Sequence, residues 1–157
     1  MDFLEKDLER IIFETSNEVL NEKGLRISGK KLRQVRLGNY GVADLITIAR
    51  NFNIYEDFSH HIVVVTVYEL KLAKVGVSAF LQAVGYAKAI SSFCEKRYPG
   101  VSVSVIISLC GRSVDNSGSF CYIPSVVYGV SFTTYDYGVD GIIFSSANSF
   151  ALINEGF

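Results

Sequence analysis

The segment from Ile62 to Tyr68 constrains the fold of this chain most, because all of its residues are β-branched or aromatic and none is charged. This composition is typical of a strand that is buried on both faces in the middle of a sheet. The strand continues directly into Glu69 and Lys71, whose side chains point to the same face about 7 Å apart. Burying an acid and a base there costs free energy unless the two charges have partners or a function. The segment therefore predicts a central strand that ends in a functional site.

A second apolar run, from Val42 to Ile48, is interrupted by Asp44. If the two runs form neighbouring strands, then Asp44, Glu69 and Lys71 converge on one point. Two carboxylates and a backbone carbonyl, here that of Leu70, are sufficient for Mg²⁺, which keeps several of its waters. Such an ion orients a phosphodiester and lowers the pKa of a bound water, while a lysine faces the phosphate or the water. The pattern predicts metal-assisted phosphodiester hydrolysis. The alternative for Asp44 is a structural role, capping the preceding turn.

At these residues the chain resembles the PD-(D/E)XK nuclease superfamily, whose signature is an Asp at the start of one strand and Glu-X-Lys on the next. In this chain Val42-Ala43 stand before the Asp, where the signature has a Pro. Downstream, Gln82-Ala-Val-Gly-Tyr86 resembles the Gln-xxx-Tyr element of the RecB-like branch, and a spacing of four puts both side chains on one helix face. The resemblance runs from about Glu5 to Tyr86. It implies a restriction-endonuclease-like fold and a Mg²⁺ or Mn²⁺ site.

The first helix offers a further acidic ligand, which this superfamily usually adds to its metal site. Residues Phe3 to Glu22 carry apolar residues at spacings of three and four, which predicts an amphipathic helix that ends before Gly24. The apolar stripe is centred near Leu8, so Glu5 lies roughly 60° and Glu9 roughly 100° from its middle. Glu5 is therefore the expected ligand and Glu9 the fallback. In the alternative, both glutamates lie on a solvated face of the helix.

A basic segment precedes the strand that carries Asp44. Within fourteen residues that contain no acid, the chain places Lys23, Arg26, Lys30, Lys31, Arg33 and Arg36. Such a strip either follows a phosphate backbone or keeps an exposed hairpin soluble. We expect Lys30, Lys31, Arg33 and Arg36, together with Tyr86, to contact nucleic acid. The net charge of −1 argues against a protein that coats nucleic acid through overall positive charge.

Other titratable residues indicate no separate site. His60 and His61 are adjacent, so on a strand they face opposite sides and only one reaches any common site; we interpret them as the first residues of the strand. Cys94, Cys110 and Cys121 are widely spaced among apolar neighbours, which is typical of reduced thiols in a cytoplasmic protein rather than of a zinc site.

The whole chain is expected to form one α/β domain over residues 1–157. At 157 residues it is long enough for one substantial core, and no apolar run is long enough to span a membrane. The N-terminus lacks the apolar region of a signal peptide. We expect a mixed sheet of about five strands, flanked by the N-terminal helix and by a central helix that begins near Ser78 and ends before Pro99.

The remaining segments complete this sheet. Val101–Leu109 should be a strand parallel to the strand that carries Glu69, because a helix connects the two. Ser125–Thr134 and Val139–Ser145 are further apolar segments, and Tyr135–Gly138 between them is expected to be a hairpin turn. Arg50–His60 is expected to be a loop or a strand extension. No assignment is made for the tail that begins at Ala147.

The predicted function is a Mg²⁺-dependent nuclease that hydrolyses DNA. Asp44 and Glu69 bind metal, Lys71 activates or steadies the nucleophile, and Glu5 and Gln82 complete the site. The alternatives are a resolvase of four-way or branched DNA, a nucleic-acid-binding module of the same fold without activity, and an interaction protein in which Glu69 and Lys71 form only a surface ion pair. The protein is expected to act as a homodimer or as a subunit of a larger assembly. RNA as substrate and the choice between end-directed and internal cleavage stay open.

Overall fold

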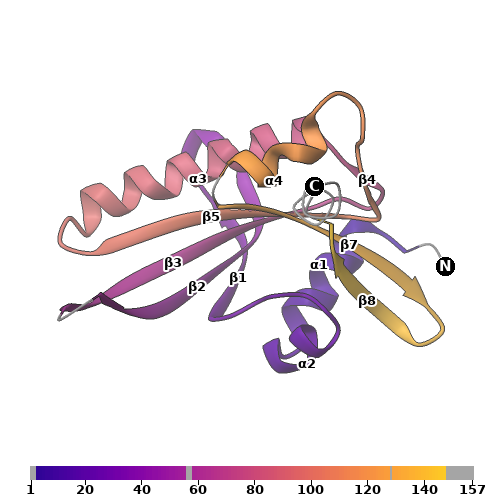
Figure 1. The fold of residues 1–157 in the computed structure, drawn as a ribbon, viewed down its shortest axis with the longest axis horizontal. Coiled ribbons are helices and arrows are strands. Elements are labelled where there is room, and N and C mark those ends of the chain that lie inside the picture. The colour runs from indigo at the N-terminus through magenta and orange to yellow at the C-terminus, as the bar shows by residue number, and fades with distance from the viewer. Residues whose placement is uncertain (1–2, 56–57, 128, 148–157) are drawn as a thin grey trace.

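A six-stranded sheet forms the centre of the computed structural model, which describes residues 3–55, 58–127 and 129–147 (Figure 1). Its strand order is β1-β2-β3-β5-β7-β8, and a small second sheet pairs β4 with β6. The strands are β1 (Lys30–Arg36), β2 (Val42–Tyr55), β3 (Phe58–Leu70), β4 (Lys74–Val75), β5 (Ser102–Gly111), β6 (Ser113–Val114), β7 (Val130–Gly138) and β8 (Gly141–Ser146). The helices are α1 (Glu5–Glu14), α2 (Asn17–Glu22), α3 (Val77–Arg97) and α4 (Ile123–Val126), with single 3₁₀ turns η1 (Gly38–Tyr40) and η2 (Phe120–Tyr122).

The sheet is mixed, as the sequence predicts. β1 pairs antiparallel with β2 and β2 with β3, whereas β3 and β5 are parallel across the α3 connection. β7 joins β5 in parallel, and β8 closes the sheet as an antiparallel hairpin partner of β7. The α/β class and the parallel pairing of β3 with β5 are therefore confirmed. The expected number of strands was wrong, because the main sheet has six strands rather than about five.

Helices cover both faces of the sheet (Figure 1), with α3 and α4 on one face and α1 and α2 on the other. Strand β3 contributes to both layers: Val65 and Val67 belong to the core cluster under α3, and Tyr68 and Leu70 belong to the cluster under α1. This two-sided burial explains why the run from Ile62 to Tyr68 is uncharged and β-branched or aromatic at every position rather than at every second one.

The predicted N-terminal helix is two helices. Helix α1 ends at Glu14, Thr15 is extended, and the Ser16 side chain caps α2 by accepting a hydrogen bond of 3.3 Å from the Val19 amide. Serine competes for backbone donors in this way, and it therefore favours starting a new helix over continuing the old one. Lys31 of β1 donates to the carbonyl oxygens of Ile12 and Thr15, which α1 leaves unpaired at its end.

Three other boundaries differ from expectation. Helix α3 begins one residue before Ser78, with Gly76 at the N-cap position and no side-chain cap. The segment 125–134 is divided between α4 and β7 rather than forming one strand. Strand β7 runs through the expected turn to Gly138, because Tyr135 is buried and its hydroxyl donates to the Leu72 carbonyl.

The segment that was expected to be a loop or a strand extension belongs to a long hairpin formed by β2 and β3. Residues 50–55 and 58–60 are strand rather than loop, and His60 and His61 lie in β3 opposite Asn53 and Phe52. Residues 148–157 of the tail lie outside the described part of the chain. In that described part, no helix combines the length and the apolar character that crossing a membrane requires.

Candidate active site

The β2–β3 pairing brings Asp44 and Glu69 to the same place. Leu45 pairs with Tyr68 in the antiparallel ladder of these two strands. One step further along this ladder, Asp44 of β2 therefore lies opposite Glu69 of β3. Side chains alternate along strands, so both carboxylates share the face of Ile46 and Val67, which belong to the cluster under α3. The predicted convergence of the two apolar runs is thus present in the structure.

Glu69 is a buried carboxylate with one cationic neighbour. It is 3% exposed, and its Oε1 lies 3.4 Å from the Lys71 Nζ, whose side chain is 31% exposed. Burial raises the pKa of Glu69 to about 7, and the negative fields of Asp44 and Glu5 act in the same direction, while Lys71 opposes them. The ion pair is therefore not an exposed surface pair, and Glu69 exchanges a proton near neutral pH.

Asp44 is half-buried among acids. Its pKa is raised first by burial and then by Glu9 and Glu5, whereas Lys71 and a hydrogen bond from Gln34 lower it. Among the described residues, Asp44 makes no hydrogen bond to the backbone of the preceding turn, so the capping alternative finds no support in its contacts. The neighbouring acids create an excess of negative charge that favours binding of a cation.

The two first-helix acids have different partners. Glu5 Oε2 accepts a hydrogen bond of 3.2 Å from the Leu72 amide, just beyond the end of β3. Glu9 is buried, and its Oε1 accepts hydrogen bonds of 2.9 Å from both Arg33 Nε and Gln34 Nε2. Glu5 raises the pKa of both Asp44 and Glu69, whereas Glu9 raises that of Asp44, where its effect is larger than that of Glu5. Glu5 therefore acts on both carboxylates, and Glu9 is occupied by Arg33 and Gln34.

Gln34 is a member of the site that the sequence did not indicate. It has a φ of 52°, and it is the one described residue other than glycine with a positive φ. Neighbouring strand residues normally point to opposite faces, yet Arg33 and Gln34 both donate to the same oxygen of Glu9. The left-handed backbone at Gln34 allows this, and the same amide reaches Asp44 on the facing strand. A single Gln in an alternating basic segment carries no pattern from which this role follows.

Gln82 and Tyr86 share one face of α3, as their spacing predicts. Gln82 Nε2 donates a hydrogen bond of 2.8 Å to the Tyr86 hydroxyl. Tyr86 is buried, and its pKa is raised by that burial and by the field of Glu69, which places this pair next to the carboxylates. Because the Tyr86 ring is covered, it does not offer a free face for base stacking. Its hydroxyl instead holds the exposed Gln82 amide in position.

The basic strip does not form one continuous cationic surface. Lys31 binds the end of α1, and Arg33 is held by Glu9 at 2.9 Å, so both charges have intramolecular partners. Lys30 and Arg36 are exposed on β1. Arg33 is also exposed but is paired with Glu9, so among the described contacts Lys30 and Arg36 are the two exposed residues of the four that form no ion pair.

The donor set matches the chemistry of a hard divalent cation. Asp44, Glu69 and the Leu70 carbonyl offer oxygen ligands, and Mg²⁺ needs only one or two carboxylates because it keeps several waters. Among the described residues, no group of three or more His, Cys, Asp or Glu side chains is gathered closely enough to hold a metal ion. The protein ligands that this site could offer a cation are therefore few.

Comparison with known proteins finds no match: no family model, no curated protein and no solved structure is significantly similar to this chain. Statements about its function therefore depend on its own residues and their arrangement.

Proposed function

We propose that this protein is a metal-dependent nuclease with a restriction-endonuclease-like core that hydrolyses phosphodiester bonds in DNA. The observation that carries the proposal is the buried carboxylate Glu69, which opposes Asp44 across β2 and β3 and lies 3.4 Å from the Lys71 amine. A structural ion pair would not need a second, facing carboxylate, and the pKa of both Asp44 and Glu69 is raised by burial and by neighbouring acids.

In this proposal Asp44, Glu69 and the Leu70 carbonyl hold Mg²⁺ or Mn²⁺. The ion supplies a Lewis acid and a water of lowered pKa. Lys71 presents a compact positive charge to the scissile phosphate or to the attacking water. Glu5 keeps the chain after β3 in place through the Leu72 amide, and Gln82, held by Tyr86, orients the phosphate or the water by hydrogen bonding.

The test is cleavage of labelled linear, circular, single-stranded and four-way-junction DNA with Mg²⁺, with Mn²⁺ or with EDTA. We expect metal-dependent cutting that falls about a hundredfold or more in Asp44→Ala and Lys71→Ala. Lys74→Ala is the matched control, because Lys74 is exposed on β4 and is not among the proposed site residues. Equal activity in Lys71→Ala and Lys74→Ala would contradict the proposal. Binding without cutting in the wild type would identify a non-catalytic module.

A further inference from the structure

A groove of about 1050 Å³ lies between α3 and the β1–β2–β3 part of the sheet. Helix α3 packs mainly against β3 and β5, so it leaves the neighbouring face of β1 and β2 uncovered. The floor of the groove is apolar and includes Leu32, Ile46 and Val65, and its helical wall includes Ile90 and Phe93. An apolar hollow of this size on a charged protein surface is typical of a binding site.

The charged residues of the groove all have the same sign. Arg36, Arg50 and Lys96 line it, and neither Asp nor Glu is among its lining residues. Within the described part of the chain, none of these three cations takes part in an ion pair. A groove with unpaired cations and no acids attracts a polyanion.

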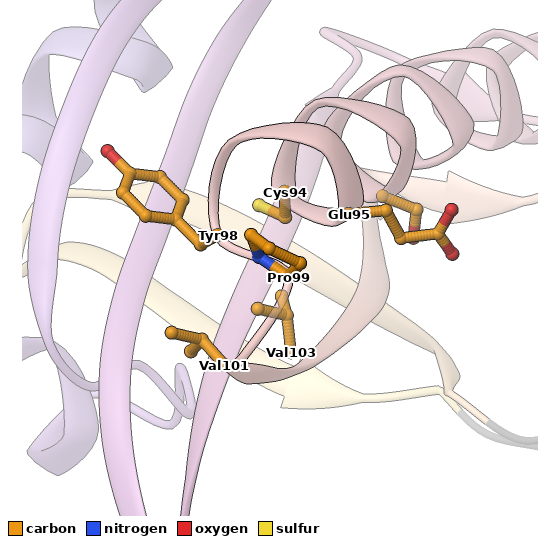
Figure 2. A pocket seen from close by; sticks show the side chains of 7 residues that line it. Cys94, Glu95, Tyr98, Pro99, Val101 and Val103 are labelled. Atoms are coloured by element: carbon orange, nitrogen blue, oxygen red, sulfur yellow. The ribbon is translucent and has the colours of Figure 1, made fainter.

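Aromatic rings stand exposed along the groove. Phe93 is 60% exposed, and Tyr40 and Tyr98 are each 51% exposed. At the end of α3 the groove shares Cys94, Tyr98 and two valines with a smaller hollow of about 180 Å³. Figure 2 shows the Tyr98 ring extending on one side of this hollow and the Glu95 carboxylate pointing the opposite way. Phe93 and Tyr98 contact each other edge to face, with ring centroids 6.3 Å apart, and the Glu95 carboxylate faces away from the Tyr98 ring. The exposed faces of the rings are thus available for stacking.

The groove and the proposed active site lie on the same faces of β2 and β3. Ile46 lines its floor, and Asp44 lies two residues further along the same strand face, about 7 Å away. On β3, Val65 lines the floor and Glu69 follows four residues later on that face, about 13 Å away. Neither carboxylate lines the groove itself, and Tyr40 of η1 packs against α3 at Gly85, so the proposed cleavage site lies beyond the end of the groove on the same strand faces.

We propose that this groove binds an unpaired strand of DNA beside the cleavage site, an inference that rests on the nuclease function proposed above. Proteins bind single strands by stacking bases on aromatic rings and by following the phosphates with cations, and the groove offers both. A duplex keeps its bases stacked inside and presents phosphates, so it makes no use of the apolar floor. A peptide helix would use the floor but would leave the three cations unexplained.

The test is binding in EDTA, where no metal-dependent cleavage occurs, measured by fluorescence anisotropy with a labelled 15-nucleotide single strand and with the matching duplex. We expect the wild type to bind the single strand at least tenfold more tightly. Phe93→Ala should weaken this binding about tenfold and Phe93→Tyr should restore it, because the ring stacks on a base. Leu81→Ala, at a side chain that is 61% exposed on the same helix and outside the groove, should bind as the wild type does.

Charge is tested by a second matched pair. Lys96→Ala should reduce the slope of log affinity against log salt by about 0.7, whereas Lys88→Ala, on α3 outside the groove, should not. Equal binding of duplex and single strand, or equal behaviour of Phe93→Ala and Leu81→Ala, would overturn the proposal. So would a dimer, seen by sedimentation velocity, that Phe93→Ala dissociates without any loss of single-strand affinity.

The outcomes separate this inference from the nuclease proposal. If the binding pattern is as expected but neither wild type nor variant cuts any DNA with Mg²⁺ or Mn²⁺, the groove stands as a single-strand site and the nuclease proposal fails. If the wild type cuts DNA but the groove variants bind the single strand as it does, the nuclease proposal stands and the groove inference fails.

Discussion

Glu69 shows how a single buried side chain links stability to pH. Its pKa in the folded protein is about 7, above the 4.5 of the free group, so between these values the folded state holds a proton that the unfolded state has lost. Stability therefore falls as the pH rises through this window, by up to about 3 kcal/mol, and stays at the lower level above it. A carboxylate kept at this cost is typical of a group that serves a function.

Glu69→Gln should remove this pH dependence. The amide has nearly the same shape but no charge, so we expect a higher urea midpoint than that of the wild type at pH 8 in EDTA, and similar midpoints at pH 5. Glu95→Gln, at an exposed position on α3, controls for the loss of a carboxylate in general. The pKa assignment would be refuted if wild type and Glu69→Gln lost stability equally between pH 5 and pH 8.

At the scale of single elements, strand β1 is distorted at the site. Gln34 occupies a left-handed conformation that costs a residue with a side chain roughly 1–3 kcal/mol, and its amide donates to the Glu9 carboxylate. Hydrogen bonds to charged groups contribute about 1.5–3 kcal/mol, so the two terms nearly offset each other. The distortion thus adds little net stability, but it places an amide between two acids.

Gln34→Gly should separate these two effects. Glycine adopts the positive φ freely, so we expect the free energy of unfolding to change by no more than about 1 kcal/mol. The hydrogen bond that lowers the pKa of Asp44 is lost, so that pKa should rise, which an NMR titration of the Asp44 carboxyl carbon measures. Gln34→Asn keeps an amide and tolerates this φ, so its Asp44 pKa should lie between that of the wild type and that of Gln34→Gly. An unshifted Asp44 pKa in Gln34→Gly would contradict this role.

The junction of α2 and β8 depends on Gly24. Its φ is 99°, and an added Cβ would lie 2.1 Å from the backbone oxygen of Phe144. Gly24→Ala should therefore lower the melting temperature by well over the roughly 2–4 °C that about 1 kcal/mol produces in a domain of this size. Gly100→Ala is the control, because an added Cβ there would have no atom within 4 Å and the backbone of Gly100 is unstrained. Similar melting temperatures for the two variants would contradict this account.

The sequence predicts elements best where a pattern is strong. The apolar run of β3 and the acids that interrupt the strands are visible in the residues themselves, so the central strand and the opposition of Asp44 and Glu69 could be predicted. The break at Ser16 could not be predicted, because the apolar periodicity continues through it. Gln34 was missed because its conformation is set by Glu9 and Asp44, which are distant in the sequence.

At the scale of the whole molecule, the placement of the helices decides where a ligand can bind. Helix α3 covers only part of one sheet face, and helix α1 brings Glu5 and Glu9 from the other face to the strand ends. The sequence indicates that both helices exist, but not which strands each one covers. The groove beside β1 and β2 therefore could not be predicted from the residues that line it.

Metal binding should stabilise the whole fold in a pH-dependent way. A ligand that binds only the folded protein stabilises it by about 2.7 kcal/mol at one hundred times its dissociation constant, which is measurable as a rise in melting temperature. Because a proton competes with the metal at Glu69, whose pKa is about 7, the apparent affinity should fall about fivefold from pH 7 to pH 6. The rise caused by 10 mM Mg²⁺ should thus be larger at pH 8 than at pH 6.

Two variants and a salt control distinguish metal binding at the opposed carboxylates from a general effect of ions. Asp44→Asn should abolish the rise in melting temperature, Lys74→Ala should keep it, and potassium chloride at equal ionic strength should not reproduce it. An equal rise at both pH values would show that the metal binds away from Glu69. A rise that persists in Asp44→Asn would show that the opposed carboxylates are not the metal site, because Mg²⁺ held by so few protein ligands does not tolerate the loss of a charged one.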